Sequence, residues 1–419
     1  MSFPRYKKYK PSGVEWLGDV PEHWEVAQLK QFVNIQNGTD HKHVEQAEGY
    51  PVMGSGGVFA YASEYLYDGE SVLLGRKGTI DKPLHIMGRF WTVDTMYWTK
   101  INLAVSGRFT YFSALTIPFS YYSTNTALPS MTKGNLSSHL IARPPLTEQT
   151  QIAAFLDRET AKINELVAEQ RRLMELLKEK RQAVISHAVT QGLNPKAPMK
   201  PSGIEWLGEV PEHWTVIPIR LVARLESGHT PSRSRPDWWQ DCRIPWFSLA
   251  DVGQIRKDGA DYIYDTKEKV SDIGLANSSA RLLPKGTVML SRTASVGFSA
   301  IMGVDMATTQ DFANWICGPR LQSEFLLYAL RSMSGEFRRL MMGSTHNTIY
   351  MPDIQSLRFA LPPIDEQADI VAYLIGETEG FDILIAEAQR AIDLLQERRT
   401  ALISAAVTGQ IDVRTAAVA

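Results

Sequence analysis

The sequence contains little cysteine, no long apolar run and no large excess of charge of either sign. Only Cys242 and Cys317 occur among 419 residues, too few for a disulfide-stapled scaffold or for a zinc site built from cysteine alone. No stretch approaches the roughly 18 apolar residues of a membrane-spanning helix, and Met1–Lys10 lacks the apolar core of a secretory signal. We therefore expect a cytoplasmic protein of about two to four globular domains, with no membrane contact.

Sequence motifs for nucleotide hydrolysis and for methyl transfer are also missing. The chain has no G-x-x-x-x-G-K-[ST] phosphate loop and no Asn-Pro-Pro-Tyr or Asp-Pro-Pro-Tyr segment, which an adenine methyltransferase is expected to carry. His41 and His43 form a metal-like pair, but no third ligand follows closely, so a surface loop is the favoured interpretation. The sequence therefore offers no catalytic constellation and no clear metal site.

Three segments of the first half recur in the second half. The matched pairs are Lys10–Trp24 with Lys200–Trp214 (13 of 15 identical), Pro144–Thr160 with Pro362–Thr378 (9 of 17) and Glu179–Thr190 with Glu397–Thr408 (8 of 12). The first pair aligns at an offset of 190 and the others at an offset of 218, so the second intervening stretch is the longer one, by 28. Each half is thus a lead-in segment, a variable globular stretch and a shared closing segment.

The closing segments are predicted to be long helices. Each follows a Pro-Pro pair, with Thr147 or Asp365 placed as N-cap, and Gly192 or Gly409 is expected to end it. An apolar stripe at spacings of three and four residues predicts a heptad seam in each helix. The stripes are Ile152, Leu156, Glu159, Ile163, Leu166, Gln170, Leu173, Leu177, Lys180 and Val184, and Ile370, Leu374, Glu377, Phe381, Leu384, Ala388, Ala391, Leu395, Arg398 and Leu402. We expect the helices to pair antiparallel; the alternative is that each packs on its own domain.

The variable stretches, Glu25–Arg143 and Thr215–Leu361, are predicted to be α/β or mostly β. They contain short apolar runs separated by turn residues, and the runs around Arg76 and Arg292 align at an offset of 216. The first stretch has 10 basic and 9 acidic residues, and the second has 17 and 14. This bias is weak for a nucleic-acid binder, and from charge alone ordinary solvated charge is the favoured explanation. A shared scaffold with divergent surfaces favours the recognition of two different targets.

Each half of the chain has the same order: a lead-in, a variable stretch, a helix that starts with P-P-[LI]-x-E-Q-x-x-I, and an A-V-T end. This doubled order resembles the specificity (S) subunit of type I restriction–modification systems. The resemblance implies an α+β chain with two α/β target-recognition domains at opposite ends of an antiparallel two-helix coiled coil, related by a pseudo-two-fold. It implies recognition of a bipartite, asymmetric double-stranded DNA site and docking of two methyltransferase (M) subunits, with restriction (R) subunits in the full complex. It also implies that the partners use S-adenosylmethionine, ATP and Mg, and that this chain uses no cofactor.

The resemblance and the repeat together predict four segments. The first recognition domain is residues 1–143, with its lead-in at 10–24, and the first spacer helix is 144–193. Residues 194–361 hold a linker, the second lead-in at 200–214 and the second recognition domain, and 362–419 hold the second spacer helix and a tail. The competing hypothesis is a non-DNA scaffold or adaptor that carries two ligand modules on a coiled-coil spacer.

Candidate DNA-binding residues are polar or basic side chains in the variable stretches, because such side chains contact base edges and phosphates. In the first stretch they are Ser55, Arg76, Lys77, Lys82, Thr124, Asn125, Thr126, Ser130 and Lys133. In the second stretch they are Arg233, Arg235, Lys285, Arg292, Thr345, His346, Asn347 and Thr348. Arg76 and Arg292 occupy equivalent positions, which favours a shared phosphate contact or a scaffold role over base reading; a polar surface turn remains the alternative for the loops.

The lead-in segments carry duplicated histidines and tryptophans. His23 and His213 stand in a shared framework, which favours packing and hydrogen bonding over catalysis. The tryptophans offer two interpretations, a docking surface for M subunits or packing against the chain's own helices. They are Trp16, Trp24, Trp206 and Trp214.

Overall fold

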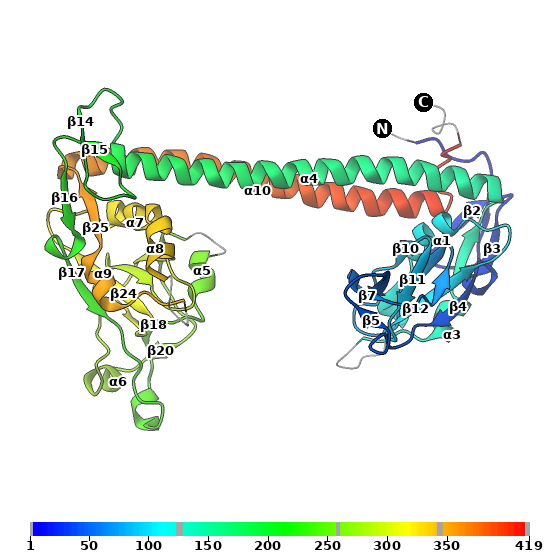
Figure 1. The fold of residues 1–419 in the computed structure, drawn as a ribbon, viewed down its shortest axis with the longest axis horizontal. Helices are drawn as coiled ribbons and strands as arrows, with labels where there is room; N and C mark the ends of the chain where they lie inside the picture. The colour runs from blue at the N-terminus through cyan, green and yellow to red at the C-terminus, as the bar shows by residue number, and fades with distance from the viewer. Residues whose placement is uncertain (1–2, 123–128, 257–259, 342–346, 415–419) are drawn as a thin grey trace. The chain divides into compact units, whose positions relative to one another are not determined.

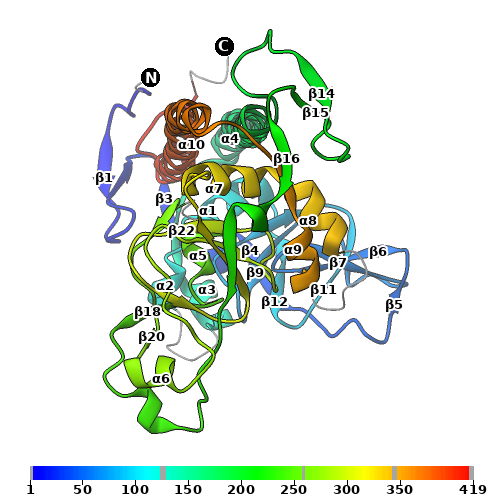
Figure 2. The same ribbon diagram turned by 90° about the vertical axis from the view of Figure 1, so that its left-hand side faces the viewer.

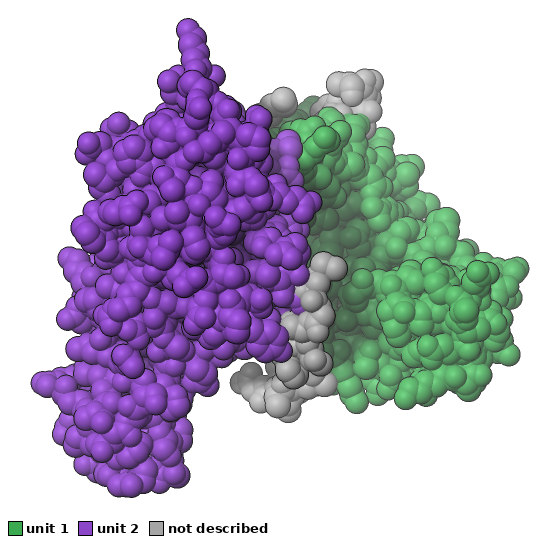
Figure 3. Space-filling model, turned by 60° about the vertical axis from the view of Figure 1, so that its left-hand side comes forward, with its two compact units in different colours: residues 1–172, 389–419 green, residues 173–388 purple. Residues whose placement is uncertain are grey.

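The computed structural model describes residues 3–122, 129–256, 260–341 and 347–414. The chain divides into two compact units, shown in different colours in Figure 3. Unit 1 is Met1–Arg172 with Gln389–Ala419, and unit 2 is Leu173–Ala388. Within the described residues, none of the helices has the length and apolar character needed to cross a membrane.

Unit 1 is built on two sheets covered by short helices (Figure 1). The first sheet has the order β10-β9-β12-β4 with antiparallel neighbours, and the second has the order β5-β7-β6-β11-β8, in which β11 and β6 are parallel. The strands are β4 (Val33–Asn37), β5 (Glu45–Gln46), β6 (Tyr50–Gly54), β7 (Gly57–Ala62), β8 (Tyr67–Asp68), β9 (Ser71–Gly75), β10 (Leu84–Ile86), β11 (Arg89–Thr92) and β12 (Met96–Ile101). The short helices are α1 (Gly107–Ala114), α2 (Phe119–Tyr122) and α3 (Lys133–Ser138).

Unit 2 repeats the central strands of unit 1 with longer insertions. Its larger sheet has the order β17-β24-β21-β22-β19, so β24 lies between β21 and β17 as β12 lies between β9 and β4. The strands of this sheet are β17 (Ala223–Ser227), β19 (Tyr262–Ile263), β21 (Val288–Ser291), β22 (Ser299–Met302) and β24 (Phe312–Cys317); the smaller sheet is β20 (Lys269–Val270), β18 (Ile244–Phe247) and β23 (Ala307–Thr308). The helices are α5 (Val252–Arg256), α6 (Asp272–Ala276), α7 (Ser323–Ser332), α8 (Ser334–Met341) and α9 (Met351–Ser356). The predicted shared scaffold is thus confirmed.

Two antiparallel pairs frame each variable stretch. The lead-ins form the hairpins β1 (Tyr9–Pro11) with β2 (Asp19–Pro21) and β14 (Met199–Pro201) with β15 (Glu209–Pro211). The first and last strands of each stretch then pair, as β3 (Glu25–Gln28) with β13 (Leu140–Arg143) and β16 (Thr215–Pro218) with β25 (Arg358–Leu361). In register, Glu25 faces Arg143 and Thr215 faces Leu361, so each stretch begins and ends at one place.

The two long helices are α4 (Leu146–Gln191) and α10 (Ile364–Val407), and within each unit a part of one lies beside a part of the other (Figures 1 and 2). In unit 1 the start of α4 shares a core with the end of α10, as Leu156 and Ile403 illustrate. In unit 2 the end of α4 shares a core with the start of α10, as Ile185 and Ile370 illustrate. The predicted antiparallel pairing is therefore confirmed in each unit.

Buried and half-buried positions on the long helices follow the predicted seven-residue repeat. One series is Leu156, Ile163, Gln170, Leu177 and Val184 in α4, with Leu374, Phe381, Ala388, Leu395 and Leu402 in α10. The other series lies one residue later than predicted, because Val167 is buried and Met174 half-buried, whereas Leu166 and Leu173 are exposed. The predicted heptad period is therefore confirmed, and the predicted register of its second series is wrong.

The helix starts also differ from prediction, by two residues. Backbone N–H groups of Glu148 and Gln149 donate to the carbonyl of Pro145, and Gln367 donates to Pro363 in the same way. The proline carbonyls therefore already accept the first helical hydrogen bonds, and Thr147 and Asp365 lie inside the first turn instead of at the N-cap. The predicted ends are confirmed, because Gly192 and Gly409 adopt positive φ angles of 74° and 76°.

Candidate nucleic-acid interface

Arg76 lies directly after β9, and its backbone is held from two sides. Its N–H donates to the carbonyl oxygen of Thr95 over 2.9 Å, and its own carbonyl accepts from the N–H of Met131 over 2.9 Å. The first bond ties the arginine to the turn before β12, and the second ties it to the segment that leads into α3. Arg76 is thereby fixed between two loops of the first variable stretch.

Arg292 lies directly after β21 and repeats this arrangement. Its N–H donates to the carbonyl of Asp311 over 2.8 Å, and its carbonyl accepts from Ile349 over 2.9 Å. Asp311 corresponds to Thr95 at the same offset as the arginines, and Ile349 corresponds to Met131 at the offset of the closing segments, as the repeat requires. The two halves therefore present an arginine in the same backbone frame.

Several predicted candidates come together around these arginines. Lys77 forms an isolated antiparallel bridge with Ser130, and Thr293 forms the equivalent bridge with Thr348, next to Asn347. Lys133 starts α3 and is exposed. The remaining members of the predicted loops lie outside the described residues; they are Thr124, Asn125, Thr126, Thr345 and His346.

The two arginine side chains are held differently. In unit 1, the Arg76 Nη1 donates to the carbonyl of Asp94 over 3.2 Å, and its guanidinium lies 5.8 Å from the ring centroid of Tyr97. In unit 2, the Nε of Arg292 is buried and has no hydrogen-bond partner within the described part of the chain. A buried donor without a partner is costly, so an acceptor that reaches this nitrogen would satisfy it.

Left-handed backbone marks the turn that follows each arginine. Gly78 has a φ of 78° in the first unit, and Ala294, at the equivalent position, has a φ of 59°. Asn347 is also left-handed, with a φ of 47°. An alanine in this region is strained, and such strain is concentrated at functional turns.

The other predicted candidates are dispersed. Ser55 lies in the turn between β6 and β7, and Lys82 and Lys285 are exposed on loops. Arg233 pairs with Glu268 and stacks over Trp239 at 3.9 Å from the ring centroid, whereas Arg235 pairs with Asp237 at 3.0 Å. Each of these two arginines is already matched with a carboxylate.

A second duplicated site fixes each lead-in to the start of a long helix. Glu148 Oε2 accepts from Trp24 Nε1 over 3.0 Å and lies 2.9 Å from His23 Nε2. Glu366 repeats both contacts with Trp214, at 3.0 Å, and His213, at 2.8 Å. Trp24 and Trp214 are buried, Trp206 is half-buried and Trp16 is exposed. The structural interpretation of both histidines is thus supported, and Trp24 and Trp214 pack internally, so they are not available as docking residues.

The glutamine of each P-P-x-x-E-Q motif ties the long helix to its variable stretch. Gln149 Oε1 accepts from the N–H of Ser106, the N-cap of α1, over 3.0 Å. Gln367 Oε1 accepts from the N–H of Gln322, the N-cap of α7, over 2.9 Å. The shared motif thereby sets the position of the short helix that covers each sheet.

Sequence reasoning missed the polar cluster around Glu148. The hydroxyl of Tyr6 donates to Glu148 Oε1 over 2.8 Å, and Arg414 lies 3.4 Å from the same oxygen. Burial and the hydrogen bond to Glu148 raise the pKa of Tyr6 well above its usual range. No repeat contains Tyr6 or Arg414, so the sequence carried no signal for this cluster.

A buried histidine was also missed. His139 Nδ1 lies 2.9 Å from the hydroxyl of Tyr122, and its ring stacks on Trp16 at 5.1 Å between centroids. Burial lowers the pKa of His139 from 6.5 to about 4. The ring is therefore neutral at physiological pH and acts in packing.

No group of three or more metal-binding side chains occurs within residues 3–122, 129–256, 260–341 and 347–414. His41 lies 3.7 Å from Glu45, and His43 packs edge-on against Trp91. The residues present therefore offer interaction surfaces, and the duplicated arginine frames are the strongest of these.

Comparisons with known proteins agree with this architecture. The chain matches the family described as type I restriction modification DNA specificity domain over residues 21–175 and 211–377. The MjaIX specificity subunit of Methanocaldococcus jannaschii is 27% identical over 46% of this chain, and this match spans only 43% of that relative. The MjaVIII specificity subunit of the same organism is 21% identical over 94% of each chain.

Solved structures show the same fold. A chain from a type I R-M system, solved to describe complex assembly and conformational transition, has a TM-score of 0.70 at 18% identity, covering 93% of this chain and 98% of its own. The HsdS subunit from Thermoanaerobacter tengcongensis has a TM-score of 0.52 at 16% identity, covering 94% and 98%. None of these relatives supports the adaptor hypothesis. Because the family match covers more than half of the sequence and falls in both halves, the chain belongs to the type I restriction–modification DNA specificity family.

Proposed function

We propose that this chain is the non-catalytic subunit that reads a bipartite, asymmetric site in double-stranded DNA, one half-site with each unit. In this proposal the chain docks two methyltransferase subunits, and restriction subunits complete the assembly. S-adenosylmethionine, ATP and Mg then belong to those partners, and this chain contributes binding and positioning.

The duplicated arginine frame carries the proposal. Arg76 and Arg292 have the same backbone partners, while the loops beside them differ in sequence and length. An arginine held at a constant place suits a phosphate, whose position does not depend on sequence, whereas variable neighbouring loops suit base edges. Thr293, Asn347 and Thr348 have side chains of the kind that read bases in the major groove.

Charge supports a division of labour with the partners. With 10 basic to 9 acidic and 17 basic to 14 acidic residues, the variable stretches offer few phosphate contacts. Few contacts imply weak intrinsic affinity and a shallow salt dependence. We therefore expect the methyltransferase subunits to supply much of the attraction to DNA.

The test is a domain exchange read out by methylome sequencing. Glu25–Arg143 is replaced by the corresponding stretch of a relative, with the junctions placed in the paired strands β3 and β13. The expected result is that one half of the methylated sequence changes and the other half stays. If both halves change, or if methylation never depends on this chain, the proposal is wrong; the second result is what an adaptor would give.

A further inference from the structure

The two units differ in how one aromatic residue near the start of each long helix is covered. In unit 1, the ring of Phe3 packs edge-to-face on Phe155, with 5.2 Å between centroids and an interplanar angle of 89°. Phe155 is only 1% exposed and belongs to the main core of the unit, and Phe3 packs against that core. An aromatic side chain of the protein itself thus covers this part of α4.

In unit 2, the equivalent pair leaves the surface open. Tyr373 is the counterpart of Phe155 at the offset of the closing segments, and Leu193 is the counterpart of Phe3 at the offset of the lead-ins. Tyr373 is 42% exposed and Leu193 is 40% exposed. The smaller leucine therefore leaves the aromatic ring of α10 uncovered.

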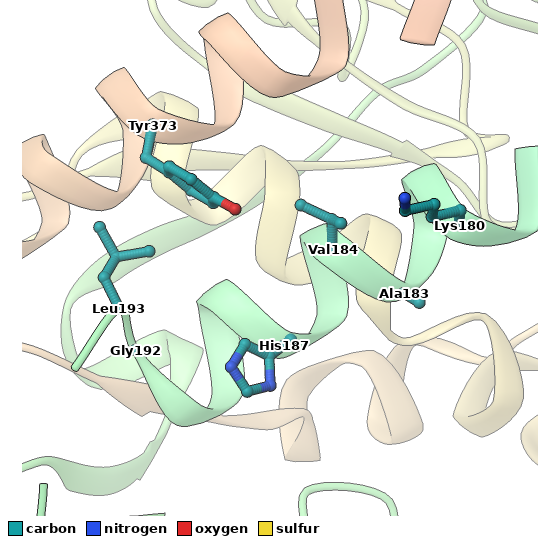
Figure 4. Close-up of a pocket in the computed structure, with 7 residues that line it drawn as sticks. All are labelled: Lys180, Ala183, Val184, His187, Gly192, Leu193 and Tyr373. Atoms are coloured by element: carbon teal, nitrogen blue, oxygen red, sulfur yellow. The ribbon is translucent and has the colours of Figure 1, made fainter. Parts of the chain in front are cut away.

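A pocket of about 530 Å³ occupies this place (Figure 4). One wall is the last turns of α4, with Val184 and His187, the other is Tyr373 of α10, and Gly192 and Leu193 close one end. Lys180 and Ala183 complete the lining. The volume falls in the range of about 300–1,000 Å³ typical of pockets that bind a ligand or an anchoring side chain.

The charges on the pocket lining indicate which charge a binding partner should carry beside the pocket. Lys180 and His187 bring positive or proton-donating groups, and the lining contains no carboxylate. Glu366 lies close to Gly192, but His213 and Trp214 already hold its carboxylate. Asp369 and Glu377 stand one turn to either side of Tyr373 on α10, outside the lining.

We propose that this pocket receives an aromatic side chain of the methyltransferase subunit, with a neighbouring carboxylate of that subunit over Lys180 and His187. The inference rests on the proposed function, which supplies the partner, and unit 1 supplies the occupant, because Phe3 shows which side chain fits. An aromatic ring that enters such a pocket buries a large area and is the usual anchor of an interface. Since Phe3 fills the place in unit 1, the contact is specific to unit 2.

The experiment is a calorimetric titration of the methyltransferase subunit into the full chain and into three variants. Leu193→Phe fills the pocket from within, as Phe3 does in unit 1, and Tyr373→Ala removes its aromatic wall. Leu282→Phe is the matched control, because Leu282 is exposed in unit 2 and does not line the pocket. We expect each pocket variant to weaken binding of the methyltransferase subunit at least tenfold and the control to bind like wild type. If two subunits bind the chain, only one of the two binding events should weaken.

Thermal unfolding checks that the variants fold, since both altered residues are substantially exposed. If the methyltransferase subunit binds the wild-type chain and both pocket variants with equal affinity, this inference is overturned while the proposed function stands. If the subunit does not bind the wild-type chain, the docking part of the proposed function fails, and the inference fails with it.

Discussion

Trp24 donates its indole N–H to Oε2 of Glu148 over 3.0 Å, although 124 positions separate the two residues in the chain. Trp214 and Glu366 form the same bond in the other unit, also at 3.0 Å. The carboxylate stands in the first turn of a long helix, where the helix dipole favours negative charge. In each unit, one glutamate thus anchors the lead-in to the first turn of a long helix and holds a buried tryptophan.

We predict that Glu148→Gln lowers the free energy of unfolding of the chain by about 1.5–3 kcal/mol, the usual loss for hydrogen bonds to a charged group. Glu366→Gln is expected to cost less, because Glu366 is more exposed than Glu148. Urea unfolding followed by tryptophan fluorescence measures both. Glu165→Gln, on an exposed face of α4, is the control. Equal losses of unfolding free energy in all three variants would show that the hydrogen bonds of Glu148 and Glu366 do not stabilise the fold.

The pKa of His139 predicts acid sensitivity. Its folded-state pKa of about 4 lies below the unfolded value of 6.5, so the unfolded chain binds more protons between these pH values. Stability from this residue is complete above pH 6.5 and is lost as the pH falls towards 4, by on the order of 2 kcal/mol. Melting temperatures of wild type and His139→Asn, measured from pH 7 to pH 4, should converge as the pH falls; a constant difference would contradict the prediction.

Ala294→Gly is expected to stabilise unit 2. Left-handed backbone costs an L-residue about 1–2 kcal/mol, and glycine avoids this cost. Glycine also loses more conformational entropy on folding, which offsets about 0.5–1 kcal/mol of the stabilisation. The net gain in unfolding free energy is therefore about 0.5–1 kcal/mol. The reciprocal variant Gly78→Ala, at the equivalent turn of unit 1, should destabilise by a similar amount. Thermal unfolding of both variants tests the prediction. If the unfolding free energy changed in the same direction in both, the two turns would not be equivalent.

Arg76→Ala and Arg292→Ala should weaken duplex binding without changing the methylated sequence. Loss of one phosphate contact reduces the slope of log affinity against log salt by about 0.9. The measurement is a salt titration of duplex binding by the complex with the methyltransferase subunit, together with its methylome. Lys7→Ala, an exposed residue outside the variable stretches, is the control. An altered methylation motif would instead assign base reading to these arginines.

The seven-residue period predicts which helix insertions fold. Seven residues added to both long helices, after Arg172 and after Ala388, keep the buried stripe in line. Nine residues amount to about 2.5 turns and rotate the stripe to the opposite face. We expect the seven-residue insertion to melt within a few degrees of wild type and the nine-residue insertion to unfold early or aggregate. Equal stability of both would show that the helix seam contributes little.

Much of the fold follows from the repeat alone. Identity between the halves locates the lead-ins, the Pro-Pro helix starts and the closing glycines, because each has a local steric cause. The heptad period was predicted correctly, but the register of one series was not, because Leu166 and Leu173 also fit a heptad and only packing shows that Val167 and Met174 turn inward in their place. Apolar spacing alone cannot choose between two neighbouring stripes when both contain apolar residues.

The candidate site was predictable in part. Alignment of the halves paired Arg76 with Arg292, and the structure shows that their backbone partners correspond. The contacts of Phe3, Tyr6 and Arg414 were not predictable, because these residues lie outside the matched segments and their partners are more than a hundred positions away. Long-range contacts of this kind depend on the closed geometry of unit 1, which local sequence does not encode.

The pairing of β3 with β13, and of β16 with β25, has a consequence for how such chains diversify. Because each variable stretch leaves and re-enters the framework on neighbouring strands, its two ends are about 5 Å apart whatever lies between them. The framework therefore accepts inserts of different length, as the greater length of the second stretch illustrates. Recombination within the nearly identical lead-ins would exchange the first variable stretch together with α4 and would leave both framework strand pairs complete.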